Sequence, residues 1–72
     1  REYEQKELAG KIEEFLRTLS ADDRRIFMCR YWGFASVAEI ARKLGCPQSK
    51  VKSSLHRTRR KLQEYLTKEG LI

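Results

Sequence analysis

The 72-residue sequence contains few of the residues on which catalysis, metal binding and cross-linking most often depend. It has one histidine, one proline and two cysteines, and Cys29 and Cys46 fit neither a zinc-ligand spacing nor a dense disulfide framework. No nucleophile with a base beside it and no phosphate-binding loop can be found. We therefore expect no catalytic residue, no metal and no cofactor, and an enzyme is the least favoured class of function.

Long apolar runs are also missing. No segment approaches the roughly 20 apolar residues that cross a bilayer, and the first residues lack the apolar core of a signal peptide. The sequence predicts a soluble protein of a reducing cytoplasm, with no membrane partner. Because position 1 is Arg and not Met, it also indicates a piece of a longer protein.

Charged residues are abundant in the chain. Lys and Arg total 16 against 10 Asp and Glu, which gives a formal net charge of +6, and 40% of the residues are hydrophobic. That apolar share is too high for a disordered tail and predicts one folded domain over residues 1–72. The positive balance favours a polyanionic partner, because Lys and Arg that contact phosphates release condensed counterions.

Apolar residues recur at helical spacing in four segments, which predicts an all-α fold of four helices. Gly10 lies within the first helix and lowers its helix propensity by roughly 1 kcal/mol relative to Ala. The second helix is expected from about residue 21 to residue 31 or 32, the third over residues 37–44 and the fourth over residues 48–68. The first helix has five apolar residues on one face: Leu8, Ile12, Phe15, Leu16 and Leu19.

Serines mark where two of these helices begin. Ser36 with Glu39 three residues later has the pattern of a capping box, and Ser20 with Asp23 resembles one. Acidic side chains in a first helical turn also interact favourably with the helix dipole. Asp22 and Asp23 are therefore expected to be helix-start residues and need no catalytic explanation.

The links between the helices carry further signals. Gly45 suits the C-cap of the third helix, and Pro47 suits the start of the fourth, where no amide donor is needed. Cys46 is expected to pack as a small apolar group. Trp32 and Phe34, between the second and third helices, are expected in the core.

Residues 36–68 have the layout of a helix-turn-helix, in which the second helix lies in the major groove of DNA. At 100° per residue, Val51, Leu55, Thr58 and Leu62 define an inward face of the last helix. Residues 49–61 contain no acid, whereas a solvated helix usually interleaves Glu or Asp. The small Ser49, Ser53 and Ser54 would let the backbone approach the groove floor. Five residues lie opposite the inward face: Ser49, Ser53, His56, Arg57 and Arg60.

This one-sided basic surface favours DNA binding over a merely solubilising role. Several groups of residues in and around this surface form a distinctive pattern: Glu39-Ile40-Ala41, Val51-Lys52-Ser53 and Leu55-His56-Arg57, followed by Arg59 and Lys61-Leu62. This pattern resembles region 4 of bacterial sigma factors of the sigma-70 family, particularly the extracytoplasmic-function type. The resemblance spans residues 19–66, with Ser54 standing where Arg is frequent in the family.

The resemblance implies a four-helix bundle without a wing, whose last helix binds the −35 promoter element on double-stranded DNA. It implies that RNA polymerase is held through the flap of its β subunit, and that the apolar surface of the first two helices docks polymerase or an anti-sigma factor. Four side chains would face bases: Lys52, Ser53, His56 and Arg57. Six more would meet phosphates: Ser49, Lys50, Arg59, Arg60, Arg24 and Arg42.

Two other readings remain open on the sequence. The output domains of LuxR-type regulators share the Glu-Ile-Ala and Val-Lys pieces but usually lack the Arg-rich continuation through Arg57, Arg59 and Arg60. A basic helical module could also dock on a protein or on acidic lipid headgroups. Salt-dependent, sequence-selective DNA affinity would disfavour such a docking module.

Overall fold

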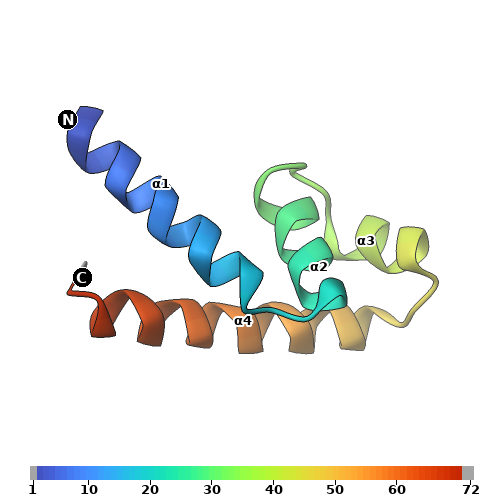
Figure 1. The fold of residues 1–72 in the computed structure, drawn as a ribbon. Coiled ribbons are helices and arrows are strands. Elements are labelled where there is room, and N and C mark those ends of the chain that lie inside the picture. Colours follow the sequence, from blue (N-terminus) through green and yellow to red (C-terminus); the bar gives the residue numbers. More distant parts are fainter. Residues whose placement is uncertain (1, 71–72) are drawn as a thin grey trace.

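The computed structural model describes residues 2–70, and their side chains from residue 7 onward. Residues 1, 71 and 72, at the ends of the expected 1–72 domain, lie outside the described residues. The described chain is all-helical, which confirms the expected fold class (Figure 1). Its four helices are α1 (Glu2–Arg17), α2 (Ala21–Tyr31), α3 (Val37–Leu44) and α4 (Gln48–Lys68).

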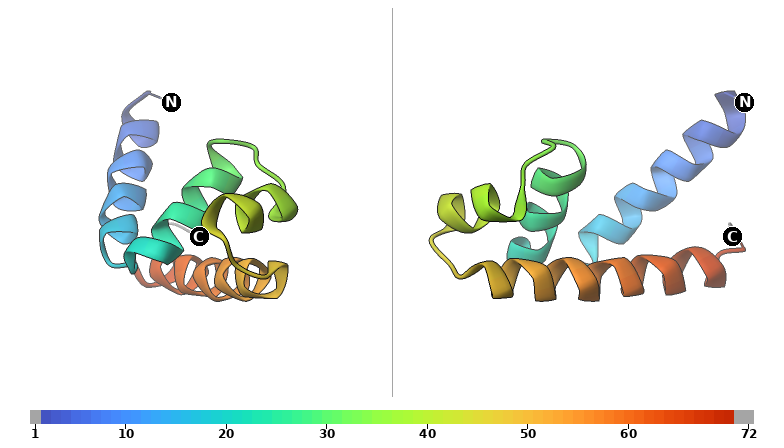
Figure 2. Two further views of the ribbon diagram at one scale, coloured as in Figure 1. Left: turned by 90° about the vertical axis from the view of Figure 1, so that its right-hand side faces the viewer. Right: turned by 180° about the vertical axis from the view of Figure 1, so that it is seen from behind.

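The longest helix, α4, runs along one side of the molecule, and the other helices pack on it (Figures 1 and 2). α2 and α3 cover its N-terminal half and also contact each other. α1 stands over its C-terminal half and leans away from it toward the N-terminus. Two polar contacts join α1 to the end of α4: Lys11 Nζ lies 3.0 Å from Glu69 Oε1, and the Tyr65 hydroxyl donates to Glu14 Oε2 at 3.0 Å.

The core lies where α2, α3 and the C-terminal end of α1 meet α4. Val51, Leu55 and Thr58 point inward as expected, with Leu62 half-buried beside them. Leu8, expected on the inward face of α1, is 41% exposed, and among the described side chains of α1 the core is reached by Ile12, Phe15 and Leu16. The buried apolar residues are Phe15, Leu16, Leu19, Ile26, Phe27, Ile40, Ala41, Val51 and Leu55.

Both predicted helix starts are present, with one difference between them. At α3 the capping box is complete: Ser36 Oγ accepts from the Glu39 amide at 3.1 Å, and Glu39 Oε1 accepts from the Ser36 amide at 3.0 Å. At α2 the Ser20 hydroxyl accepts from the Asp23 amide at 3.2 Å. The Asp23 carboxylate does not complete the box, because it turns toward α4 instead.

The link between α2 and α3 contradicts one expectation. Trp32 and Phe34, expected in the core, are 55% and 86% exposed. Phe27 already fills the space beneath this link, and the rings of Tyr31 and Trp32 pack on it from outside at 4.7 and 6.1 Å. A Cβ at Gly33 would lie 2.9 Å from the Cys29 carbonyl oxygen, so this close turn requires glycine. Phe34 then takes a φ of 54° and projects outward.

The described helices include none that is both long enough and apolar enough to span a membrane. Among the described side chains, those of residues 7–70, no three His, Cys, Asp or Glu are grouped so that they could hold a metal ion.

Candidate nucleic-acid interface

The turn between α3 and α4 fixes the direction of α4. Gly45 takes the left-handed conformation, with a φ of 67°, and the amide of Cys46 donates to the Ala41 carbonyl at 3.0 Å. Cys46 packs against the core as a small apolar group, as expected. Pro47 is the N-cap of α4 and supplies no side-chain hydrogen bond, and the first turn of α4 holds no acid. The N-terminal end of α4 is therefore free of negative side chains of its own, which suits an anionic ligand.

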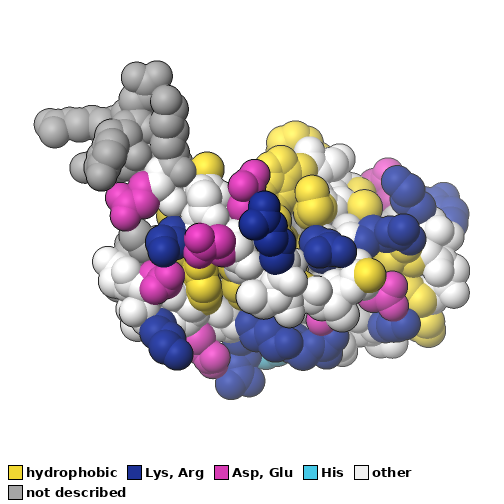
Figure 3. All heavy atoms as spheres, in the orientation of Figure 1, with side chains coloured by type: hydrophobic (Ala, Val, Ile, Leu, Met, Phe, Trp, Pro, Cys, Tyr) yellow, Lys and Arg dark blue, Asp and Glu magenta, His cyan; other side chains and the backbone are white. Residues whose placement is uncertain are grey.

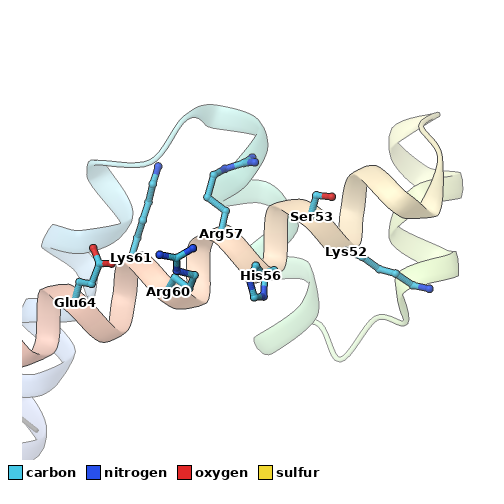
Figure 4. Close-up of a pocket in the computed structure, with 7 residues that line it drawn as sticks. All are labelled: Lys52, Ser53, His56, Arg57, Arg60, Lys61 and Glu64. Atoms are coloured by element: carbon cyan, nitrogen blue, oxygen red, sulfur yellow. The ribbon is translucent and has the colours of Figure 1, made fainter.

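An open hollow runs along the exposed side of α4, and we call it the basic hollow (Figure 4). Ser53, Arg57 and Lys61 project from one side of the helix, while Lys52 and His56 project from the other. All four side chains that the sequence predicts to face bases are exposed and line this hollow. Its lining residues are Lys52, Ser53, His56, Arg57, Arg60, Lys61 and Glu64.

The charge of the basic hollow is strongly one-sided. Four of its side chains, two Lys and two Arg, are cationic, and its single carboxylate belongs to Glu64 at the C-terminal end. Nothing on α4 between residues 49 and 61 therefore repels an approaching phosphate. Such a surface raises the local concentration of polyanions and speeds their association.

One acid from another helix does reach this surface. Asp23, at the start of α2, is buried, and its Oδ1 accepts from the Ser54 hydroxyl at 2.7 Å and from Arg57 Nη2 at 2.9 Å. Burial opposes ionisation of Asp23. The hydrogen bonds from Ser54 and Arg57, with the charges of Arg57 and Lys61, outweigh it and hold the pKa of this carboxyl below its ordinary value.

The Asp23 contact corrects one expectation and adds a residue that the sequence did not reveal. Ser54 was expected to face the DNA groove, but it is buried against Asp23, because the core-facing side of α4 is wider than the apolar stripe. Asp23 was expected only at a helix start. No sequence signal links it to Arg57, which lies 34 positions away and belongs to another helix.

The side chains predicted to meet phosphates are spread more widely. Arg60 lines the basic hollow. Arg59 lies toward the end of α2, where its Nη1 donates to the Tyr31 hydroxyl at 2.9 Å. Arg24, on α2, is half-buried. The remaining three are exposed, on α3 or the first turn of α4, outside the basic hollow: Arg42, Ser49 and Lys50.

A second concave surface, between α1, α2 and α4, is apolar. Arg59 is the single charged residue in its lining, which we call the apolar groove. In Figure 3, hydrophobic side chains gather over the end of α2 and the loop that follows, whereas Lys and Arg gather along the lower edge, on α4. The lining residues of the apolar groove are Ile12, Phe27, Tyr31, Trp32, Arg59 and Leu62.

Comparison with known families identifies a match to the chain. Residues 9–62, three quarters of the chain, match the family described as Sigma-70, region 4. No curated protein and no solved structure matches the chain. The matched range covers residues 9–17 of α1, all of α2 and α3, and α4 through Leu62. It therefore includes the helix-turn-helix as far as residue 62 and the whole basic hollow except Glu64. The chain therefore belongs to the sigma-70 region 4 family, whose helix-turn-helix domains bind DNA and interact with RNA polymerase in promoter recognition.

Proposed function

We propose that this chain is the −35 recognition domain of a sigma factor of the extracytoplasmic-function type, acting in the bacterial cytoplasm. In this proposal residues 1–72 form a single domain, and its helix-turn-helix spans about residues 36–68. The observation that carries the proposal is the basic hollow, in which four cationic side chains surround small and hydrogen-bonding groups on the exposed side of α4. A helix of this kind fits the major groove of duplex DNA.

Within the proposal, four side chains of the basic hollow face bases: Lys52, Ser53, His56 and Arg57. Lys and Arg recognise guanine through its O6 and N7 atoms, and Ser bonds to several base edges. Six side chains around them meet phosphates and set the position of α4 along the duplex: Ser49, Lys50, Arg59, Arg60, Arg24 and Arg42. Arg59 keeps further N–H donors for this purpose beside the one given to Tyr31.

The apolar groove is the proposed docking site for the flap of the RNA polymerase β subunit. Its lining is almost wholly apolar and includes Tyr31 and Trp32, which are 42% and 55% exposed. Large amphipathic aromatic side chains contribute most to protein interfaces. An anti-sigma factor that occupied the same groove would block polymerase.

Selection of duplexes from a randomised pool, followed by fluorescence anisotropy on the selected duplex and a scrambled one, tests the DNA-binding part. We expect one preferred sequence bound by one chain per site, with affinity that falls as salt rises. If the five proposed phosphate-binding cations each displace a counterion, log K should fall against log salt with a slope of roughly −4.5. Two chains per site would favour a LuxR-type regulator, and equal affinity for both duplexes would contradict base recognition.

Two single-charge variants sharpen this experiment. Lys52→Ala removes a cation from the basic hollow and should lower the ratio of affinities for the selected and scrambled duplexes by roughly tenfold, which is within the range for one base contact. Lys68→Ala removes the same charge from the last turn of α4, outside the basic hollow, and should leave that ratio unchanged. Equal effects of the two variants would assign Lys52 to general electrostatic attraction.

A further inference from the structure

The contact between Asp23 and Arg57 joins the start of α2 to the face of α4 on which the proposed function depends. Arg57 is 52% exposed and lines the basic hollow, while Asp23 is almost completely buried. The bond between them is 2.9 Å long and charge-assisted, so it is roughly twice as strong as a neutral hydrogen bond. Asp23 is itself fixed, because Ser54 donates to the same oxygen at 2.7 Å from inside the core.

This arrangement restricts an otherwise mobile side chain. A free arginine has about 2 kcal/mol of rotamer entropy, and most of it is lost when the guanidinium binds a base. Asp23 occupies a donor on Nη2, so the guanidinium is held at that end while its other N–H groups remain available. Much of the ordering is therefore complete before DNA arrives, which is the usual benefit of preorganisation.

We propose that Asp23 is a positioning residue for DNA recognition: it orients Arg57 in the basic hollow and so determines how well α4 discriminates between DNA sequences. The inference rests on the proposed function. Asp23 does not contact the base. Its carboxylate instead partly offsets the charge of Arg57. This lowers the attraction of Arg57 for phosphates at large, so that Arg57 binds best to a base that fits the orientation in which its guanidinium is held.

The variant Asp23→Asn tests this inference, because the amide oxygen can still accept from Ser54 while the charge that holds Arg57 is gone. We expect the selected-to-scrambled affinity ratio to fall roughly fivefold, part of what one bidentate base contact contributes. Affinity for the scrambled duplex should stay equal or rise, since Arg57 is no longer neutralised. Loss of affinity for both duplexes in equal measure would overturn the inference.

A matched control stands one position away. Asp22 is exposed at the same end of α2, so Asp22→Asn makes the same change of charge without touching the contact to Arg57. It should leave the affinity ratio unchanged. An equal fall for Asp22→Asn and Asp23→Asn would mean that the overall charge, and not the orientation of Arg57, sets discrimination.

Two further measurements separate positioning from a general effect on the fold. In an Arg57→Ala background, Asp23→Asn should cause no further fall in the affinity ratio, because the side chain that it orients is absent; an undiminished fall would overturn the inference. In the free protein, NMR of the arginine side chains should show slowed rotation of the Arg57 guanidinium, and this signature should vanish in Asp23→Asn. A pool that yields no preferred duplex would contradict the proposed function itself. A preferred duplex that Asp23→Asn discriminates as well as the unsubstituted chain does would contradict only this inference.

Discussion

The carboxylate of Asp23 is buried, yet the groups around it keep it charged. Burial raises its pKa. The hydrogen bonds from Ser54 and Arg57 and the charges of Arg57 and Lys61 lower the pKa by a larger amount, so the pKa in the folded chain lies below the ordinary one. An Asp in the unfolded chain has a pKa of about 3.9. Ionised Asp23 therefore stabilises the fold fully above that pH, and this contribution is lost as the pH falls through the folded pKa.

Asp23→Asn should lower the free energy of unfolding by about 1–2 kcal/mol at pH 7, a modest value because Arg57 is half-exposed to water. The difference between the natural chain and the variant should narrow below about pH 4, where protonation removes the same charge from the natural chain. Urea unfolding followed by circular dichroism at pH 7 and pH 3 measures both values. A difference that is the same at the two pH values would show that the charge of Asp23 contributes nothing.

Thr58, unlike Asp23, is a buried polar residue whose polar group makes no hydrogen bond that would stabilise the fold. It is completely buried in α4, and its hydroxyl has no hydrogen-bond partner among the described residues. Thr58→Val keeps the shape and removes the unsatisfied hydroxyl, so it should raise the free energy of unfolding by about 1 kcal/mol. Thermal unfolding of the two chains checks this; a lower melting temperature for Val would reveal a partner for the hydroxyl.

At the level of residues, helical geometry alone placed most of the exposed and buried positions on α4 correctly. It selected four side chains that line one hollow, and their contacts with bases stay predictions. The same geometry could not reveal Asp23, because a contact across 34 positions depends on how α2 packs on α4. It misplaced Ser54 for the same reason, since the start of α2 covers a position that appears exposed on an isolated helix.

Among the elements, α3 is the shortest helix and the one most dependent on its ends. It has eight residues, begins with the complete capping box of Ser36 and Glu39, and ends at Gly45 with a φ of 67°. An isolated helix of this length is not stable in water. Its caps and the burial of Ile40 and Ala41 against α4 therefore hold it in place.

The two glycines Gly45 and Gly10 should respond to the same substitution with opposite signs. A Cβ at either position meets no atom within 4 Å, so only the backbone differs. Gly45→Ala forces alanine into the left-handed region and should destabilise the fold by about 1 kcal/mol. Gly10 lies within the regular helix α1, where alanine has the higher helix propensity, so Gly10→Ala should raise the free energy of unfolding by about 0.5–1 kcal/mol.

Melting temperatures of both variants measure these effects together. A lower melting temperature for both variants would mean that a side chain at position 10 meets a neighbouring group that the described residues do not include. A higher melting temperature for both variants would mean that the turn between α3 and α4 accepts alanine at position 45 without losing stability.

Local signals predicted the elements well where caps or turn residues are present. Ser36, Gly45 and Pro47 bound α3 and the start of α4 at the expected positions. The start of α1 at Glu2 has no such signal, and it lies before the first apolar residue of the helical pattern. The exposure of Trp32 and Phe34 was not predictable either, because it depends on Phe27 having already filled the space beneath them.

For the whole molecule, the basic hollow and the apolar groove lie on different sides of α4, because their lining residues on this helix fall on different faces at 100° per residue. Trp32 is the only tryptophan in the chain, and it lines the apolar groove. Its ring is half-exposed, so its fluorescence reports on whatever covers it.

Trp32 emission should therefore shift to shorter wavelength when the isolated flap domain of the RNA polymerase β subunit is added. Duplex DNA, which is proposed to bind on the other surface, should leave the emission wavelength unchanged. Leu8→Ala, an exposed apolar position outside the groove lining, serves as a control that should keep the shift. A shift caused by DNA and none caused by the flap would reverse the assignment of the two surfaces.

The length of α4 has a mechanical consequence. The helix continues without a break for 21 residues, which corresponds to about 30 Å. The basic hollow extends along this helix from Lys52 to Glu64, and α1 packs on the C-terminal part of α4 through the rings of Phe15 and Tyr65. A regular helix of this length behaves as a stiff rod, so a body attached near α1 and a body attached near the first turns of α4 are held at a constant separation and angle. In the proposed function, α4 would therefore hold the DNA and the polymerase flap at a fixed separation and orientation.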